Sequence, residues 1–289
     1  MLETIEKKES KKENQVIGRN RAWLSISAEN LLSNVRELQR IMPDTCKFMA
    51  VVKANAYGHG SVRISSLLNR NGIYHFAVAT IEEAIELRLN GIKGEILILG
   101  YTDPLLAREL IKYQLTQTVI DYSYSRELDD TGLPLTVQIK VDTGMHRLGI
   151  TAEDTERILQ IFHSNNLKVT GLFTHLCVAD SLKKEDVLFT KWQIERFKKL
   201  TQELIRHQIR VPIHIQSTYG LINYNRLSCD YARIGIGMYG LLSSLQDKTV
   251  VKANLKPVLS LHSRVALIRE ISENETVGYG RTYIAGKKG

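Results

Sequence analysis

The stretch "AVVKANAYGHG" (residues 50–60) carries an apolar, strand-like run directly into a lysine, Lys53, and then into closely spaced glycines. Comparable strand-like runs recur along the chain, with helical segments between them. Together with the first run, at residues 47–52, they lie at residues 75–80, 95–100, 117–121, 135–142, 169–176, 212–217 and 231–237. Eight strands that alternate with helices indicate parallel strands with crossover connections. The pattern predicts an α/β fold, a (β/α)8 (TIM) barrel, with a doubly wound sheet as the alternative.

The helical segments carry their own start and stop signals. Residues 31–42 have helical spacing and end before Pro43, which cannot continue a helix. Thr80 and Glu83 have the spacing of a capping box, and Thr151 and Asp154 form a looser version of it. These signals predict that one helix starts at Thr80 and another at Thr151.

The pattern changes at both ends of the predicted barrel, which spans residues 30–245. The charged residues 1–20 indicate a disordered tail or linker. Residues 21–29 alternate between apolar and polar side chains like a half-buried strand. In residues 246–289, strand-like runs follow one another without a helix between them, at 259–271 and 275–285. We expect this last segment to be part of a β domain, to which residues 21–29 add a strand.

The composition excludes several functional classes. The net charge of +8 comes from basic residues dispersed among acidic ones, and the 7% of aromatic residues do not interleave with them, so we expect no nucleic-acid partner. No apolar run approaches the about 18 residues of a membrane span, and the N-terminus lacks an export signal, so we expect no membrane contact from this segment. Cys46, Cys177 and Cys229 are widely spaced, which favours free, buried thiols in a reducing cytoplasm.

In a parallel barrel the catalytic groups lie at the C-terminal ends of the strands. An ammonium group placed there, as in Lys53, loses hydration, which favours the neutral amine that acts as a nucleophile or base. Lys53 is therefore a candidate to form a Schiff base with a carbonyl cofactor. Glycine-rich backbone after strands seven and eight is suited to bind a phosphate. Further candidates lie at or near the C-terminal ends of strands five to eight: Lys140, Asp142, His146, Arg147, Thr174, His175, Gln216, Ser217, Thr218 and Arg233.

Several motifs of the chain resemble those of one family, in the same order. "AVVKANAYGHG" is similar to the pyridoxal-phosphate lysine motif of the alanine racemase family, and "KVDTGMHRLG", "GLFTHL", "ARIGIGMYG" and "VGYGRTY" resemble its later motifs. The resemblance covers residues 21–285. Within the family, "RAW" (21–23) and "THLCVADS" (174–181) resemble the serine/alanine racemases of vancomycin-resistance clusters. The resemblance implies an isomerase that interconverts L- and D-alanine for peptidoglycan precursors, with serine as the alternative substrate.

The resemblance also implies a role for each site residue. Lys53 would hold pyridoxal 5'-phosphate and act as the base on one face of the substrate, and Tyr279 from the partner subunit of a homodimer would act on the other. Removing a proton from one face and returning it to the other needs two bases. His175 would orient Tyr279. Arg233 would face the pyridine nitrogen; because arginine cannot accept a proton, the cofactor would be a weaker electron sink and transamination would be suppressed.

The remaining implied roles concern anionic groups. Arg147 would bind near the phenolic oxygen of the cofactor and the carboxylate of the substrate, and a carbamylated Lys140 would anchor that arginine. The phosphate would be held by Tyr57, Ser217 and the backbone of Gly235 and Ile236.

The chain departs from the family's pattern in two places. Gln216 stands where the family usually has asparagine. The family's β domain continues beyond the position of Gly289, so the resemblance implies a C-terminally truncated member. The N-terminal tail resembles the linker that follows a membrane domain, as in the cytoplasmic part of a longer protein. Three alternatives stay open: a non-catalytic pyridoxal-phosphate-binding protein, which Tyr279 disfavours, an inactive truncated fragment, and a decarboxylase, which Arg233 disfavours.

Overall fold

The structure, a computed structural model, describes residues 20–244 and 247–289. The chain divides into two compact units. One is Ser27–Val258; the described part of the other is residues 20–26 together with Leu259–Gly289. The predicted tail at residues 1–20 lies, except for Asn20, outside the described residues.

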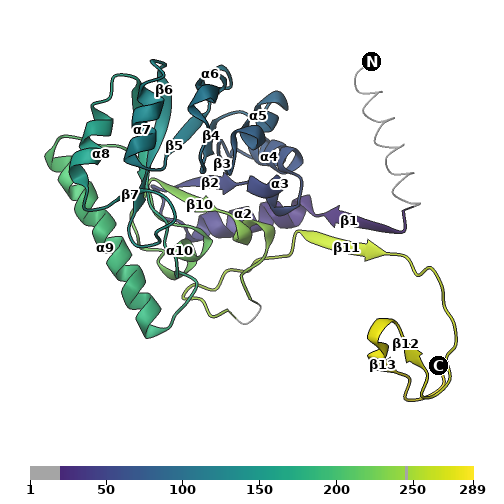
Figure 1. Ribbon diagram of the computed structural model, residues 1–289. Coiled ribbons are helices and arrows are strands. Elements are labelled where there is room, and N and C mark those ends of the chain that lie inside the picture. Colours follow the sequence, from purple (N-terminus) through teal and green to yellow (C-terminus); the bar gives the residue numbers. More distant parts are fainter. Residues whose placement is uncertain (1–19, 245–246) are drawn as a thin grey trace. The chain divides into compact units, whose positions relative to one another are not determined.

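The larger unit is built on a parallel sheet that closes into a barrel (Figure 1). Within the described residues the sheet has nine strands, of which eight follow one another in the order β10-β2-β3-β4-β5-β6-β8-β9, while the short β7 (Ile150–Thr151) pairs with β6 off this path. The ring closes between β9 and β10, where Gln216 forms a bridge with Ala232 and Asp230 N donates to Ile213 O at 2.8 Å. The predicted (β/α)8 barrel is confirmed. The eight barrel strands are β2 (Lys47–Val51), β3 (His75–Val78), β4 (Glu95–Ile98), β5 (Thr116–Val119), β6 (Leu135–Asp142), β8 (Leu167–Phe173), β9 (Ile213–His214) and β10 (Tyr231–Ile234).

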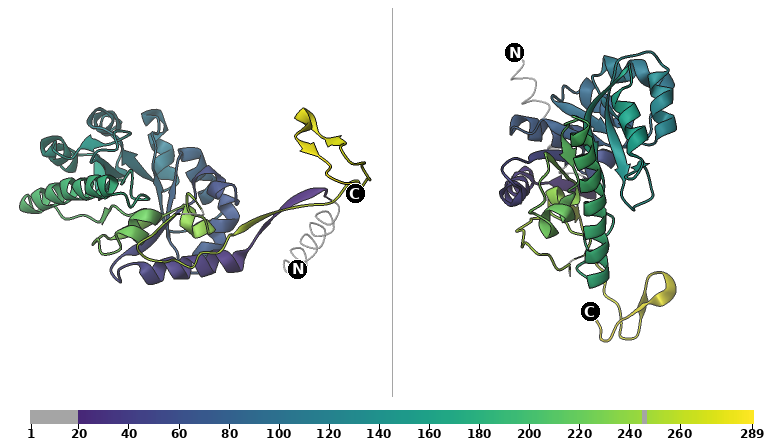
Figure 2. Two further views of the ribbon diagram at one scale, coloured as in Figure 1. Left: turned by 90° about the horizontal axis from the view of Figure 1, so that it is seen from below. Right: turned by 90° about the vertical axis from the view of Figure 1, so that its left-hand side faces the viewer.

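Helices surround the strands, as Figure 2 shows from below. They are α2 (Ala28–Ile41), α3 (Lys53–Tyr57), α4 (Ser61–Arg70), α5 (Ile81–Leu89), α6 (Ala107–Lys112), α7 (Tyr122–Asp129), α8 (Thr155–Phe162), α9 (Lys184–Arg206) and α10 (Thr218–Asn223), with 3-10 turns η1 (Pro104–Leu106) and η2 (Ile236–Tyr239). Of the helices in the described part of the chain, none combines the length and the apolar character needed to cross a bilayer.

The capping predictions had different outcomes. Thr80 caps α5 as expected, with its hydroxyl accepting from Glu83 N. The prediction for Thr151 was wrong, because this residue belongs to a short strand, β7 (Ile150–Thr151), that pairs with β6. The carboxylate of Asp154 caps α8 instead and accepts from Arg157 N. A two-residue strand is too short to leave a periodic signal in the sequence.

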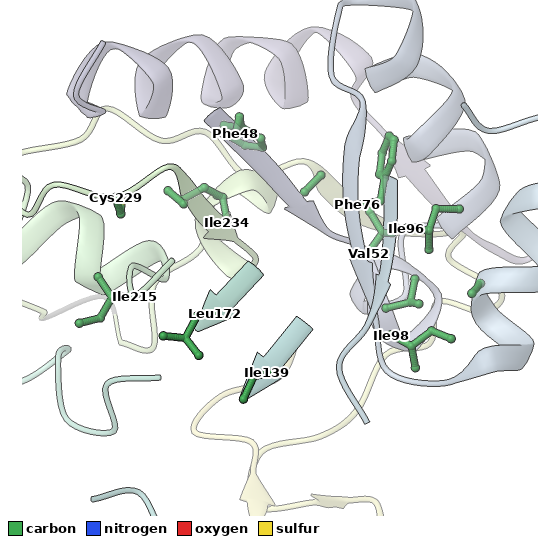
Figure 3. Packing of buried hydrophobic residues seen from close by; sticks show 14 of the residues in the cluster. Phe48, Val52, Phe76, Ile96, Ile98, Ile139, Leu172, Ile215, Cys229 and Ile234 are labelled. Atoms are coloured by element: carbon green, nitrogen blue, oxygen red, sulfur yellow. The ribbon is translucent and has the colours of Figure 1, made fainter. Parts of the chain in front are cut away.

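The hydrophobic core lies mainly between the strands and the helices. Successive side chains of a strand point to opposite faces, so Phe48 and Ala50 of β2 pack outward against the helices, while Met49 and Val51 point into the barrel. Figure 3 shows members of this outer layer between the strands and the surrounding helices. Each large apolar side chain buried there contributes about 1.5–3 kcal/mol.

The smaller unit contains two antiparallel strand pairs. β1 (Ala22–Ile26) pairs with β11 (Leu259–Ser263), and β12 (Thr276–Val277) pairs with β13 (Tyr283–Ile284), next to the turn η3 (Tyr279–Arg281). The strand expected over 259–271 therefore ends at Ser263. The apolar side chains that follow, such as Leu267 and Ile268, are exposed and do not pair in a sheet within the described residues.

The three cysteines are free in the described chain. Cys229 is buried, whereas Cys46 and Cys177 are only partly buried, which corrects the expectation that all three are core residues. Cys46 and Cys229 precede the adjacent strands β2 and β10, and their Sγ atoms lie 3.3 Å apart. This contact was not predictable from the wide separation of the cysteines in sequence. It forms because the first barrel strand, β2, lies beside the last one, β10.

Candidate active site

A cavity of about 480 Å³ opens at the C-terminal ends of the barrel strands. Lys53, Lys140, Arg147 and Arg233 contribute positive charge to it, and no carboxylate lines it among the described residues. Such a cavity is suited to an anionic ligand. Its other lining residues are Val51, Tyr57, Ala79, Leu99, Gly100, Leu148, Phe173, His175, Ser217, Thr218, Tyr219, Gly235 and Ile236.

Lys53 stands at the start of an unusual backbone turn. Ala54, Asn55, Ala56 and Tyr57 all have φ between 51° and 54°, so α3 is one turn of left-handed helix. Left-handed backbone costs about 1–2 kcal/mol for each residue that has a Cβ. The turn therefore persists only because its surroundings hold it. Gly58 and Gly60, which follow the turn, also have positive φ values of 86° and 91°, a conformation that glycine adopts without a steric cost.

Glu83 of α5 holds that turn from outside. One carboxylate oxygen accepts from Ala54 N at 2.6 Å and the other accepts from Ala79 N at 2.7 Å. The side chain of Asn55 adds a second support, since its Oδ1 accepts from Ser61 N at 2.8 Å. Glu83 thus joins the segment after β2 to the segment after β3, and both segments line the cavity.

Replacing Glu83 with glutamine is expected to lower the free energy of unfolding by about 1–3 kcal/mol. Glutamine has one accepting oxygen, so one of the two backbone N–H groups loses its partner. Urea unfolding of Glu83→Gln measures the loss, and Glu127→Gln on the exposed face of α7 is the matched control. Equal stability of the two variants would show that Glu83 does not hold the turn.

Arg233 is buried in the wall of the cavity, and both terminal nitrogens of its guanidinium donate hydrogen bonds to the barrel. Its Nη1 donates to His214 Nδ1 at 2.9 Å and to His214 O at 3.1 Å, and its Nη2 donates to Thr174 O at 2.6 Å. The guanidinium also lies over the ring of Phe173, 5.0 Å from the centroid. Burial lowers the pKa of Arg233 to about 10, which leaves it charged at neutral pH.

His175 lies beside this arginine. Its Nδ1 accepts from Arg233 Nη2 at 3.3 Å, because a guanidinium can only donate. Burial, together with the charges of Arg233 and Lys140, lowers the pKa of His175 to about 3. The imidazole is therefore neutral, with its proton on Nε2, and is available to donate a hydrogen bond in the cavity.

Lys140 is the second buried cation of the site. Only 6% of the residue is exposed, and its Nζ donates to Val141 O at 2.7 Å. Burial lowers its pKa from the ordinary 10.5 to about 7, and the charge of Arg233 acts in the same direction. A large fraction of this lysine is consequently a neutral amine at physiological pH.

The structure brings most of the predicted site residues together and separates a few. Lys53, Tyr57, Lys140, Arg147, His175, Ser217, Thr218, Arg233, Gly235 and Ile236 all line the cavity. Asp142 and His146 do not; they pair with each other at 2.8 Å, and Asp142 also accepts from Gly144 N, so they shape the loop before Arg147. Gln216 is buried and bonded to Tyr224 O. Tyr279 belongs to the other unit and is fully exposed.

The residues that support the site, His214, Phe173 and Glu83, are not among the candidates predicted from the sequence. His214 and Phe173 alternate with outward-facing neighbours on β9 and β8, so they point into the barrel, and that alternation was a usable signal. Glu83 was identified only as a capping residue, because its contact with Ala54 joins positions 29 residues apart.

The family is decided by comparison with known proteins. The family model described as "Alanine racemase, N-terminal domain" matches residues 26–243, which make up three quarters of the chain. The chain belongs to the alanine racemase family.

Curated relatives carry related names. An "Amino-acid racemase" of Enterococcus faecalis is 44% identical over 95% of this chain, and a "Serine/alanine racemase" of Enterococcus gallinarum is 40% identical over 93%. This chain spans 39% and 38% of the length of these two relatives. An "Alanine racemase" of Carboxydothermus hydrogenoformans is 36% identical, and the match covers 92% of this chain and 72% of the relative.

Solved structures of the family have the same fold. The crystal structure of an alanine racemase from E. faecalis has a TM-score of 0.84 at 30% sequence identity, and the match covers 93% of this chain and 73% of that one. The likeness thus extends beyond the barrel into the residues of the smaller unit.

Proposed function

We propose that this chain carries the cofactor site of a pyridoxal-phosphate-dependent amino-acid racemase that interconverts L- and D-alanine, with serine as the second candidate substrate. The observation that carries the proposal is the cavity itself, where Lys53, Arg147 and Arg233 converge at the mouth of an alanine-racemase barrel without a lining carboxylate among the described residues. D-Alanine made in this way would feed peptidoglycan precursors. We further propose a homodimer in the cytoplasm as the working form.

The lining residues fit pyridoxal phosphate. Its phosphate would lie against Tyr57, Ser217, Gly235 and Ile236, which all line the cavity. A Cβ at position 235 would come within 2.7 Å of the Tyr57 hydroxyl, so glycine keeps the backbone accessible there. Lys53 would hold the aldehyde carbon, and Arg233, a donor that cannot accept a proton, would hold the ring nitrogen. Bound in this way, the group withdraws electrons from the substrate's α-carbon and acidifies its proton.

The proton transfers fall to the protein. Lys53 would remove or return the α-proton on one face, and Tyr279 of the partner subunit on the opposite face. The full exposure of Tyr279 within its own chain supports a role outside that chain. The proton on Nε2 of the neutral His175 would be directed at Tyr279, and Arg147 would hold the substrate carboxylate.

Lys140 is proposed to be carbamylated. A neutral lysine amine attacks carbon dioxide to form a carbamate with release of one proton, and the lowered pKa of Lys140 supplies that amine near neutral pH. The change replaces a buried cation by an anion and so removes the repulsion that Lys140 experiences from Arg233 and Arg147. Carbon-13 NMR of protein equilibrated with labelled bicarbonate would detect the carbamate, and Lys140→Met would lack its signal.

In carbon-dioxide-free buffer, the pH dependence of the free energy of unfolding should report the protonation of the unmodified Lys140. Its folded-state pKa of about 7 lies below the unfolded value, so between pH 7 and about 10 the unfolded chain binds more protons and stability rises with pH. We expect Lys140→Met to be more stable than the wild type at pH 6 and to lose most of this rise. Urea unfolding at pH 6–9 measures both effects, with Lys168→Met as the exposed control. A parallel rise in wild type and Lys140→Met would contradict the burial argument.

Deuterium exchange tests the reaction. Cofactor-loaded protein is mixed with L- or D-alanine in heavy water, and NMR and chiral chromatography follow deuterium at Cα in both enantiomers. Racemisation predicts label in both from either starting enantiomer; serine in a parallel reaction separates the two substrates. Cofactor binding without exchange would favour the non-catalytic alternative. Release of carbon dioxide from basic amino acids would favour the decarboxylase.

A further inference from the structure

A row of polar side chains crosses the interior of the barrel between its two ends. It begins at Glu95, the first residue of β4, where the side chain lines a second cavity of about 440 Å³. Gln138 Nε2 lies 2.8 Å from Glu95 Oε1, and His214 Nε2 lies 2.6 Å from Gln138 Oε1. His214 Nδ1 then meets Arg233 Nη1 at 2.9 Å, in the wall of the candidate active site.

The chemistry of the two end groups, a carboxylate and a guanidinium, determines which atom donates and which accepts in every hydrogen bond of this row. A carboxylate only accepts, so Gln138 must turn its amide nitrogen toward Glu95 and its oxygen toward His214. That oxygen requires a proton on His214 Nε2. At the other end a guanidinium only donates, so His214 Nδ1 must be unprotonated. Both ends therefore require the same neutral tautomer of His214, and no member of the row is free to reverse.

The barrel is built to accommodate the row. Gln138 and His214 are 1% and 0% exposed, so a broken contact there would leave a buried polar atom unpaired. Gly171 lies opposite Gln138 on the adjacent strand, and a Cβ at position 171 would come within 2.9 Å of the Gln138 side chain. The ring of Phe173 stacks on His214 at 4.7 Å and fixes its plane. His75 Nδ1 lies 3.3 Å from the second carboxylate oxygen of Glu95.

We propose that Glu95 and Gln138 are positioning residues for Arg233, acting through His214 from the opposite end of the barrel. Neither side chain lines the candidate active site. Their role is to hold the imidazole so that its Nδ1 receives Arg233 in one orientation. The catalytic meaning of this role rests on the proposed function, in which Arg233 would hold the ring nitrogen of the cofactor. The hydrogen-bonding pattern itself is independent of the proposed function.

A charge swap between positions 95 and 138 tests the row. Gln138→Glu alone places two carboxylates in contact, and we expect a loss of at least 10-fold in kcat. In the double variant Glu95→Gln, Gln138→Glu, the amide nitrogen of residue 95 donates to the new carboxylate, which still accepts from His214 Nε2. The order of donors and acceptors is restored with the same number of charges, so kcat should return to within about 3-fold of the wild type. Gln202→Glu at an exposed position of α9 is the control for an added carboxylate.

Nitrogen-15 NMR of histidine-labelled protein tests the same row without any activity. His214, assigned by the signals missing from His214→Gln, should have an unprotonated Nδ1 and a protonated Nε2, and the Nε2 signal should shift in Gln138→Met, which keeps the volume and removes the partner. A protonated Nδ1 in the wild type, or a swap variant no more active than Gln138→Glu, would overturn the proposal. If the wild type does not racemise amino acids, the proposed function fails while the NMR result still decides the row. Should Gln138→Glu fail to fold, Gln138→Met supplies both readouts.

Discussion

Lys53→Ala is expected to lose racemase activity by about 10³-fold or more, because one side chain would supply both the covalent attachment of the cofactor and one of the two bases. Lys53→Arg separates these contributions from simple charge. It keeps a cation in the cavity, yet a guanidinium neither forms the covalent link nor gives up a proton near neutral pH. We therefore expect Lys53→Arg to be as inactive as Lys53→Ala.

Two further measurements complete the test of Lys53. Borohydride reduction of the cofactor-loaded wild type, followed by peptide mass mapping, should find the added mass on residue 53. Methylamine added to Lys53→Ala should restore part of the activity, since it replaces the missing amine, and should do nothing for Lys53→Arg. Activity of Lys53→Ala above a tenth of the wild type would remove this residue from the mechanism.

Arg233→Leu is expected to destabilise the barrel by about 3–5 kcal/mol, the largest effect on stability that the site offers. The guanidinium donates to Thr174 O and to both His214 O and His214 Nδ1. Leucine leaves Thr174 O and His214 Nδ1 without these partners, whereas His214 O keeps the hydrogen bond from Thr174 N at 3.1 Å. Arg233 is also the strongest of the charges that depress the pKa of His175 and of Lys140, so both pKa values should rise in the variant.

Urea unfolding at pH 8 measures the stability change, with Arg36→Leu on the exposed face of α2 as the control for a lost surface arginine. Histidine NMR titration follows His175. Arg233→Lys should recover only part of the loss, because a single ammonium group cannot reach acceptors that the planar fork of arginine spans. A loss below about 1 kcal/mol in Arg233→Leu would mean that water or a rearranged neighbour satisfies the acceptors.

Much of the fold and of the candidate site was predictable from local patterns. The barrel strands have apolar runs of the expected length, and the positions that follow them, such as Lys53, His175 and Ser217, fall at the cavity because parallel strands end together. The exceptions have local causes as well. Asp142 ends β6 and His146 follows it, yet the two side chains pair with each other and shape a loop, which residue type alone does not reveal.

The sequence by itself determined the alternation of strands and helices, the identity of the groups at the barrel mouth and the motifs of the family, since these depend on residues close together in the chain. Only the tertiary structure decided how those groups are held. Glu83 meets Ala54, Cys46 meets Cys229, and Gln138 meets His214 76 residues away. Closing a barrel places its first and last strands side by side, and such contacts leave no periodic trace in the sequence. The same burial lowers the pKa of Lys140 and of His175, because a side chain loses its water only when distant strands surround it.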